Sequence, residues 1–181
     1  MYYIVFIFNN KLTNISPTNH VFLRLNIKEM QFTARKLNTF LFFKLPSAFW
    51  SGVRVKTITE AQCVVSVRHR WINQNPFKSM YFAVQAMAAE LSTGALVMLY
   101  IKKSGRNISM LVANNQANFS KKATGKITFT CQDGLMVQNA IDEAIKTNQG
   151  QTFWMSATGI DEKGDCVSTF KFEWTIKCKS N

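Results

Sequence analysis

The sequence predicts an α+β fold in which an antiparallel β-sheet wraps around one long, buried α-helix. In the stretch 75–99, residues from Lys78 onward are apolar on every side of a helix, and Glu90 is the only charged residue between Lys78 and Lys102. A helix that is apolar all round belongs inside a protein core or a bilayer. The flanking segments alternate apolar and polar residues with period two, which predicts strands with one polar face. Turn signals between these segments favour antiparallel pairing.

Before the central helix, the chain predicts a shorter helix and a hairpin. Apolar residues recur at helical spacing over 32–49, interrupted by Pro46, which favours an amphipathic helix over the alternative of an anchor lying on a membrane surface. Residues 53–60 and 62–71 alternate with period two and are predicted to pair as a hairpin. The Asn-Gln-Asn-Pro sequence at 73–76 predicts a turn that leads into the central helix.

After the central helix, two further strand pairs and a short helix are predicted. Residues 108–123 and 126–132 are expected to be antiparallel neighbours joined by a short turn. Residues 135–147 predict a short amphipathic helix. Residues 151–161 and 166–179 predict a closing hairpin across the turn Glu-Lys-Gly-Asp.

The length and the N-terminal sequence indicate one domain with an extension. Of the 181 residues, we expect 30–181 to form a single domain, which is long enough for a real core. Residues 1–29 begin with a short apolar run that has no basic segment or cleavage site, followed by a polar, turn-rich stretch. We therefore expect 1–29 to be a flexible extension or an upstream mis-started segment, not a signal peptide or a membrane span.

The formal charge of +12 raises the question of a nucleic-acid partner, but the distribution of charge argues against one. Residues 1–56 hold eight Lys and Arg residues against one acid, Glu29, and the remaining excess is scattered. No zinc-finger, helix-turn-helix or RNA-recognition signature is found. Basic groups of this kind also suit the phosphates of small ligands. We expect no nucleic-acid partner.

The four cysteines are far apart in the sequence and form no C-x-x-C pair or histidine cluster. This spacing gives little support to a metal site or a disulfide framework. Reduced thiols in a cytoplasm are the expectation, so we predict a cytoplasmic protein with no metal. The cysteines are Cys63, Cys131, Cys166 and Cys178.

Glu90 is the strongest functional candidate, because carboxylates are almost never fully buried unless they are paired or used. One alternative is a structural role at a helix edge or at an interface with an arginine partner. Another is a transmembrane helix over 80–101, with Lys102 among the flanking cations. Several polar residues in mid-span, such as Gln85, are costly in lipid, so no membrane span is expected.

The spacing of Asn75, Tyr81-Phe82-Ala83 and the acid Glu90 in Ala-Ala-Glu resembles the phenylacetate-pathway type of hotdog-fold acyl-CoA thioesterases. In that family an Asn, a His-Gly-Gly and an acid occupy the matching places. FSKKATGKITF and DEKGD resemble the strand-turn-strand and the last hairpin of the family. The resemblance covers roughly residues 37–177 and is closest to a branch that is a domain of unknown function.

The resemblance implies a hotdog fold, a homodimer or tetramer, and hydrolysis of an acyl-CoA or similar thioester without a cofactor. Glu90 would act as base or nucleophile, Asn75 would belong to the site, and the backbone N–H groups of Phe82 and Ala83 would form the oxyanion hole. Here Tyr81-Phe82-Ala83 replaces His-Gly-Gly, so the Phe82 ring crowds space that glycine leaves open. The alternative function is a non-catalytic acyl- or lipid-binding module.

Four cations are candidates for binding CoA phosphates in this fold, although solvated strand ends are the simpler interpretation. They are Arg106, Lys121, Lys122 and Lys126. Dehydratase-type hotdog proteins need a histidine with the acid, and neither His20 nor His69 falls at the matching position. Asp142 and Glu143 are expected to lie on a solvated helix face.

Overall fold

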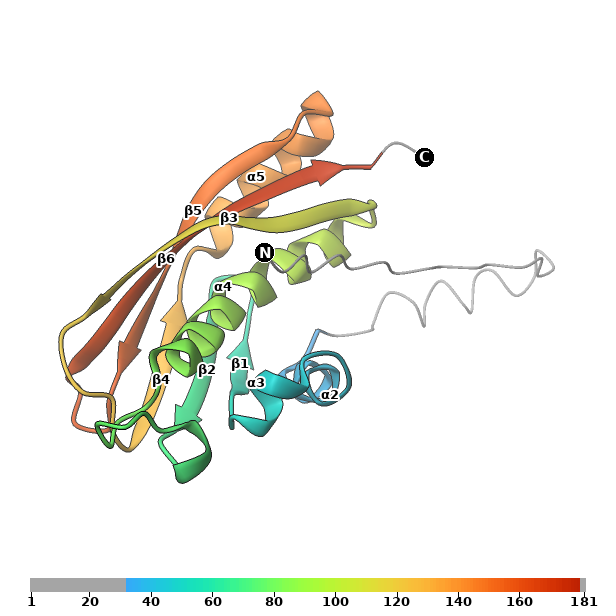
Figure 1. The fold of residues 1–181 in the computed structure, drawn as a ribbon. Coiled ribbons are helices and arrows are strands. Elements are labelled where there is room, and N and C mark those ends of the chain that lie inside the picture. The colour runs from blue at the N-terminus through green and yellow to red at the C-terminus, as the bar shows by residue number, and fades with distance from the viewer. Residues whose placement is uncertain (1–31, 180–181) are drawn as a thin grey trace.

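The computed structural model describes residues 32–179. The extension predicted over 1–29 lies outside the described residues. The described part begins with two short helices, α2 and α3, and ends with the strand β6 (Figure 1). In chain order the elements are α2 (Ala34–Lys44), α3 (Pro46–Trp50), β1 (Arg54–Ile58), β2 (Cys63–Arg68), η2 (Trp71–Asn73), α4 (Phe82–Ser104), β3 (Ile108–Phe119), β4 (Lys126–Cys131), α5 (Gly134–Thr147), β5 (Gln151–Ile160) and β6 (Cys166–Cys178).

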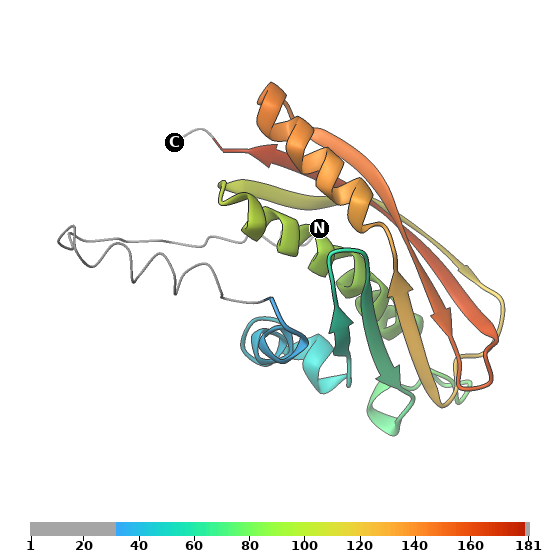
Figure 2. The same cartoon turned by 180° about the vertical axis from the view of Figure 1, so that it is seen from behind.

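A six-stranded antiparallel sheet in the order β1-β2-β4-β5-β6-β3 curves along α4 (Figure 1). The helix α4 contacts β2, β4, β5 and β6, and apolar side chains from these elements form one continuous core. The helices α2 and α3 lie beside β1, and α5 packs against α4 and β5 (Figure 2). The predicted α+β fold, an antiparallel sheet around a long central helix, is confirmed.

The predicted hairpins at both ends of the domain are present. β1 pairs with β2, with Val55 opposite Val65, and β5 pairs with β6 along ten residues of β5. Pro46 is the first residue of α3 and separates it from α2, because proline lacks the backbone N–H that would continue the hydrogen bonds of α2. The helical and hairpin predictions for these segments are therefore correct.

The predicted pairing of residues 108–123 with 126–132 is wrong. β3 pairs with β6, whereas β4 lies between β2 and β5. Strand lengths account for this difference. The twelve residues of β3 form a long ladder with the thirteen of β6, and the six residues of β4 match all six of β2. The connection 120–125 crosses beneath the start of α4, where the Met80 N–H donates to the Ala123 carbonyl (2.8 Å).

Two buried polar contacts fix the position of α4 on β6. The Ser168 hydroxyl donates to Gln85 Oε1 (2.9 Å), and the Trp174 indole N–H donates to Thr93 Oγ1 (3.0 Å). Because buried polar groups are costly without partners, these pairs favour one register of the helix over its neighbours.

In the described part of the chain, α4 is also the one helix that is long and apolar enough to cross a membrane by length and composition. Within its most apolar window, 61% is buried inside the protein, and a core helix passes the same test. The expectation of no membrane span stays a prediction.

Candidate functional site

Glu90 lies in the middle of α4, on the stripe of the helix that is least covered by the sheet. The partly buried residues of this stripe that precede Glu90 lie three, four and seven positions before it, which places them on one face. They are Ala83, Ala86 and Met87, all small or flexible apolar residues, whereas Gly94 and Val97 further along the same face are buried. The carboxylate is therefore the only charged group on this face of α4 up to its last turn.

The Glu90 carboxylate lies beside Gly94, one turn further along α4, and Gly94 in turn faces the indole ring of Trp174 on β6. A Cβ atom placed on Gly94 would lie 3.9 Å from Glu90 Oε1 and 3.0 Å from Trp174 Cη2. Within residues 32–179, no hydrogen bond or ion pair reaches the Glu90 carboxylate, so the interpretation as half of an arginine pair has no support there. Burial without a partner raises the pKa of Glu90 to about 7.

The N-terminus of α4 offers two free backbone donors. Tyr81 is the N-cap and makes no side-chain capping bond, and the first helical hydrogen bonds run from Val84 (3.0 Å) and Gln85 (3.4 Å) to the Tyr81 carbonyl. The N–H groups of Phe82 and Ala83 have no acceptor among the described residues. Such free donors at a helix N-terminus stabilise negative charge.

The Phe82 side chain is 55% exposed and lies between two other rings. Its centroid is 4.9 Å from the ring of Tyr81 and 6.4 Å from that of Phe119, at the end of β3. The three rings form an aromatic surface next to the two free donors.

Glu90 and the two free donors do not converge within one chain. Seven or eight residues separate them along α4, which corresponds to roughly 10–12 Å of helix axis. A thioester carbonyl held at Phe82 and Ala83 is therefore out of reach of the Glu90 of the same chain.

The structure places Asn75 in the turn before α4. Its Oδ1 accepts from the N–H groups of Phe77 (2.9 Å) and Ser79 (3.2 Å), and its Nδ2 donates to Ser79 Oγ (3.0 Å). The amide is thus occupied in shaping the turn, which fixes the direction in which the chain enters α4.

The four candidate cations do not form one cluster. Lys121, Lys122 and Lys126 lie near the N-terminal end of α4, whereas Arg106 follows its C-terminus, roughly 30 Å away along the helix. Lys121 is also paired with Asp161 (2.8 Å) and with Asp165. These contacts hold the pKa of Lys121 above its usual range.

No group of three or more His, Cys, Asp or Glu side chains in residues 32–179 is arranged to hold a metal ion. Cys63 and Cys131 are opposite each other on β2 and β4, and both are free thiols. Burial raises the pKa of each to about 12, which makes them poor nucleophiles.

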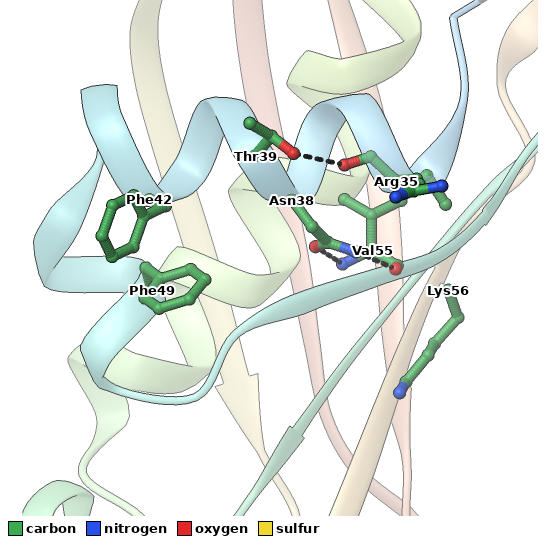
Figure 3. A pocket seen from close by; sticks show the side chains of 8 residues that line it. Arg35, Asn38, Thr39, Phe42, Phe49, Val55 and Lys56 are labelled. Atoms are coloured by element: carbon green, nitrogen blue, oxygen red, sulfur yellow. Dashed lines mark hydrogen bonds between the residues drawn. The ribbon is translucent and has the colours of Figure 1, made fainter.

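A separate groove of about 620 Å³ lies between α2 and β1 (Figure 3). The Asn38 side chain closes its floor by pairing with both backbone groups of Val55 (2.9 Å each). Phe42 and Phe49 lie at one end, and Arg35 and Lys56 lie along its sides. None of the residues that line this groove is among the site residues predicted from the sequence.

The family described as Domain of unknown function (DUF4442) matches residues 33–176. The chain belongs to this family. No curated protein sequence matches the chain at a significant level.

Solved structures with the same fold include proteins described as thioesterases. One is a probable thioesterase of unknown function from Pseudomonas aeruginosa (20% identity, TM-score 0.67, 80% of this chain and 96% of that chain covered). A thioesterase from Haemophilus influenzae is similar over 83% of this chain and 94% of its own (14% identity, TM-score 0.62). A protein of unknown function from Chlorobaculum tepidum is similar over 81% of this chain and 94% of its own (14% identity, TM-score 0.69). The resemblance to thioesterase-like hotdog proteins is thereby confirmed at the level of fold and family.

Proposed function

We propose that this chain hydrolyses an acyl thioester, with acyl-CoA as the substrate class and Glu90 as the essential carboxylate. The observation that carries the proposal is the environment of Glu90: a largely buried carboxylate in mid-helix, beside Gly94, with no partner within the described residues and a pKa raised to about 7. A group with this pKa is poised to take a proton near neutral pH. The fold shared with proteins described as thioesterases supports the same chemistry.

In the reaction that we propose, the Glu90 carboxylate removes a proton from water as the water oxygen bonds to the thioester carbon. The carbonyl oxygen becomes an oxyanion, which accepts hydrogen bonds from the N–H groups of Phe82 and Ala83. The C–S bond then breaks, and the thiolate takes the proton from Glu90, which leaves a carboxylic acid and a thiol. If Glu90 is instead the nucleophile, an acyl anhydride forms first, the thiolate leaves, and water cleaves the anhydride.

Because Glu90 and the free donors are too far apart in one chain, the proposed site combines two subunits. Ala86 lies midway between Phe82 and Glu90 on the least covered stripe of α4. Two α4 helices packed antiparallel about an axis at Ala86 would bring Glu90 level with Phe82 of the partner subunit. The small side chains of Ala83 and Ala86 permit this close approach.

The sheet edge at β3 supports the same assembly. β3 (Ile108–Phe119) ends the sheet, and no described element covers its outer edge. Unpaired strand edges favour continuation of the sheet across a two-fold axis. Such an axis perpendicular to the sheet also makes the two α4 helices antiparallel. We therefore propose a homodimer joined through β3 and α4.

A non-catalytic acyl-binding module is the second candidate, favoured by the exposed Phe82 ring in the place of a family glycine. If this ring closes the approach to the free donors, acyl-CoA binds without being hydrolysed.

Turnover of acyl-CoAs of increasing chain length, measured for wild type and Glu90→Gln, separates the two functions. We expect hydrolysis by wild type and a loss of about 100-fold or more in the variant. Glu173→Gln on β6 is the matched control, because it removes another partly buried carboxylate without changing α4. Stabilisation by acyl-CoA without turnover in wild type would favour the binding module.

A further inference from the structure

The outer surface of α2 and α3 carries a cluster of aromatic side chains that face solvent. Phe43 is 69% exposed, Trp50 64% and Phe42 44%, whereas α2 contributes Leu37 and Leu41 to the core. Together with half-buried Phe49, the three exposed aromatic residues form what we call the α2–α3 aromatic patch.

The rings of this patch contact one another. Phe42 lies 4.8 Å from Phe43, 5.1 Å from Phe49 and 6.5 Å from Trp50 between centroids. Exposed large apolar groups that gather in one place mark interaction sites more often than scattered ones do. Contiguity therefore distinguishes this patch from single exposed residues.

The polypeptide that carries the patch is strongly basic. Residues 32–59 contain five Lys and Arg residues and no Asp or Glu. None of the five forms an ion pair with a described carboxylate, and Arg54 instead stacks on the Phe49 ring (3.6 Å). The five cations are Arg35, Lys36, Lys44, Arg54 and Lys56.

Neighbouring elements add further cations. Lys36 lies close enough to Lys102 of α4 for the two positive charges to repel each other. Arg54 and Arg70 repel each other in the same way. The closest acid in the sequence, Glu60, is paired with Lys103 (2.6 Å). The charged groups that adjoin α2 and α3 from β1, from the last turn of α4 and from Arg70 are therefore cations.

The turn η2, beside the end of α3, carries two more exposed apolar side chains. The Asn73 side chain donates to the Ser51 carbonyl (2.9 Å), which ties η2 to the end of α3. Next to this contact in the sequence are Trp71, 83% exposed, and Ile72, 58% exposed. Trp50 and Trp71 are thus brought to the same end of the domain by one hydrogen bond.

We propose that α2 and α3 dock on the surface of a membrane that contains anionic lipids. Exposed Phe and Trp rings beside Lys and Arg residues match the bilayer interface, where rings lie among the head groups and cations meet lipid phosphates. A purely apolar partner would leave the cations unmatched, and a purely acidic one would leave the rings in water. The anionic interface satisfies both, and the inference does not depend on Glu90.

Vesicle flotation with the full chain tests this proposal. The vesicles contain phosphatidylcholine alone or with about a third phosphatidylglycerol, the composition that sets the surface potential. We expect binding to the anionic vesicles only, weakening as salt rises, with a blue shift of tryptophan fluorescence. Phe43→Ser with Trp50→Ser, and separately Lys44→Glu with Lys56→Glu, should each weaken binding by about tenfold or more. Circular dichroism checks that the variants fold.

Leu135→Ser with Lys146→Glu is the matched control, because it removes an exposed apolar residue and a cation from α5. Equal losses in the control would show that net charge alone drives binding and would overturn the proposal, as would no binding. A change in oligomeric state for Phe43→Ser with Trp50→Ser would assign the patch to a second copy. The difference in fluorescence between wild type and Trp50→Phe isolates the signal of Trp50. If acrylamide fails to quench that signal in the free chain, another segment covers the patch and the proposal is wrong.

Discussion

Gly94 of α4 lies directly against Trp174 of β6: a Cβ atom on Gly94 would stand 3.0 Å from Cη2 and 3.1 Å from Cζ2 of the indole. The ring cannot retreat easily, because it is buried and its N–H is bonded to Thr93. The absence of a side chain at Gly94 therefore lets α4 approach β6 in the turn of the helix that follows Glu90.

Gly94→Ala should destabilise the fold despite the better helix propensity of alanine. The propensity gain is roughly 1 kcal/mol, whereas overpacking costs about 1–3 kcal/mol. We expect a net loss of about 1 kcal/mol in the free energy of unfolding, measured by urea denaturation. A variant more stable than wild type would show that Trp174 moves freely, contrary to the contact described.

Glu90→Gln should make the protein more stable at high pH and change little at low pH. Burial raises the folded pKa of Glu90 to about 7, so the folded state binds more protons than the unfolded state between the ordinary pKa of about 4.5 and 7. The free energy of unfolding of wild type therefore falls as pH rises through this range. The full loss is at most roughly 3 kcal/mol, and solvent contact at the carboxylate reduces it. Denaturation of both proteins at pH 5 and pH 8 measures the difference, and equal pH dependence would contradict the environment assigned to Glu90.

The proposed dimer predicts that wild type elutes as a dimer at micromolar concentration and that Ala86→Glu shifts it toward monomer. The substitution places two carboxylates against each other at the proposed axis, where like charges repel. Leu135→Glu on exposed α5 is the control and should leave the dimer intact. Light scattering that finds a monomeric wild type, or an unaffected Ala86→Glu, would rule out this arrangement.

The cations near the N-terminal end of α4 predict that CoA raises the melting temperature. Lys122→Ala with Lys126→Ala should reduce that increase, whereas Arg106→Ala, at the far end of α4, should not. Binding to DNA should be weak at physiological salt, because the basic excess outside residues 1–56 is scattered along the sequence. Tight DNA binding that weakens steeply as salt rises would instead favour a nucleic acid over CoA as the ligand of these cations.

Most of the fold could be predicted from local patterns in the sequence, and the wrong prediction concerns the order of the strands in the sheet. The apolar run of α4, the hairpins and Pro46 are encoded in neighbouring residues, so periodicity and turn residues were sufficient to find them. The partner of β3 is β6, almost sixty residues further along the chain. Adjacent strands pair by default, and only the matching lengths of β3 and β6 argued otherwise.

The candidate site was predictable in part for the same reason. Glu90 was conspicuous as the one charge in an apolar helix. Trp174, which packs against Gly94 one turn after Glu90, lies on β6, and nothing near Trp174 in the sequence marks that contact. The separation of Glu90 from Phe82 could be counted along the helix. Only the structure could show that the side-chain amide of Asn75 is occupied by hydrogen bonds within its own turn.

The pH dependence of acyl-CoA hydrolysis tests most directly whether the Glu90 carboxylate carries the chemistry. The pH profile of kcat/KM reports the pKa of the essential group in the free enzyme. Our account predicts that kcat/KM of wild type rises with pH to a plateau, with a midpoint at about 7. Glu90→Gln should lose that midpoint along with about 100-fold or more of the rate. A profile in which wild type and Glu90→Gln share the same midpoint and rate would contradict the assignment of Glu90.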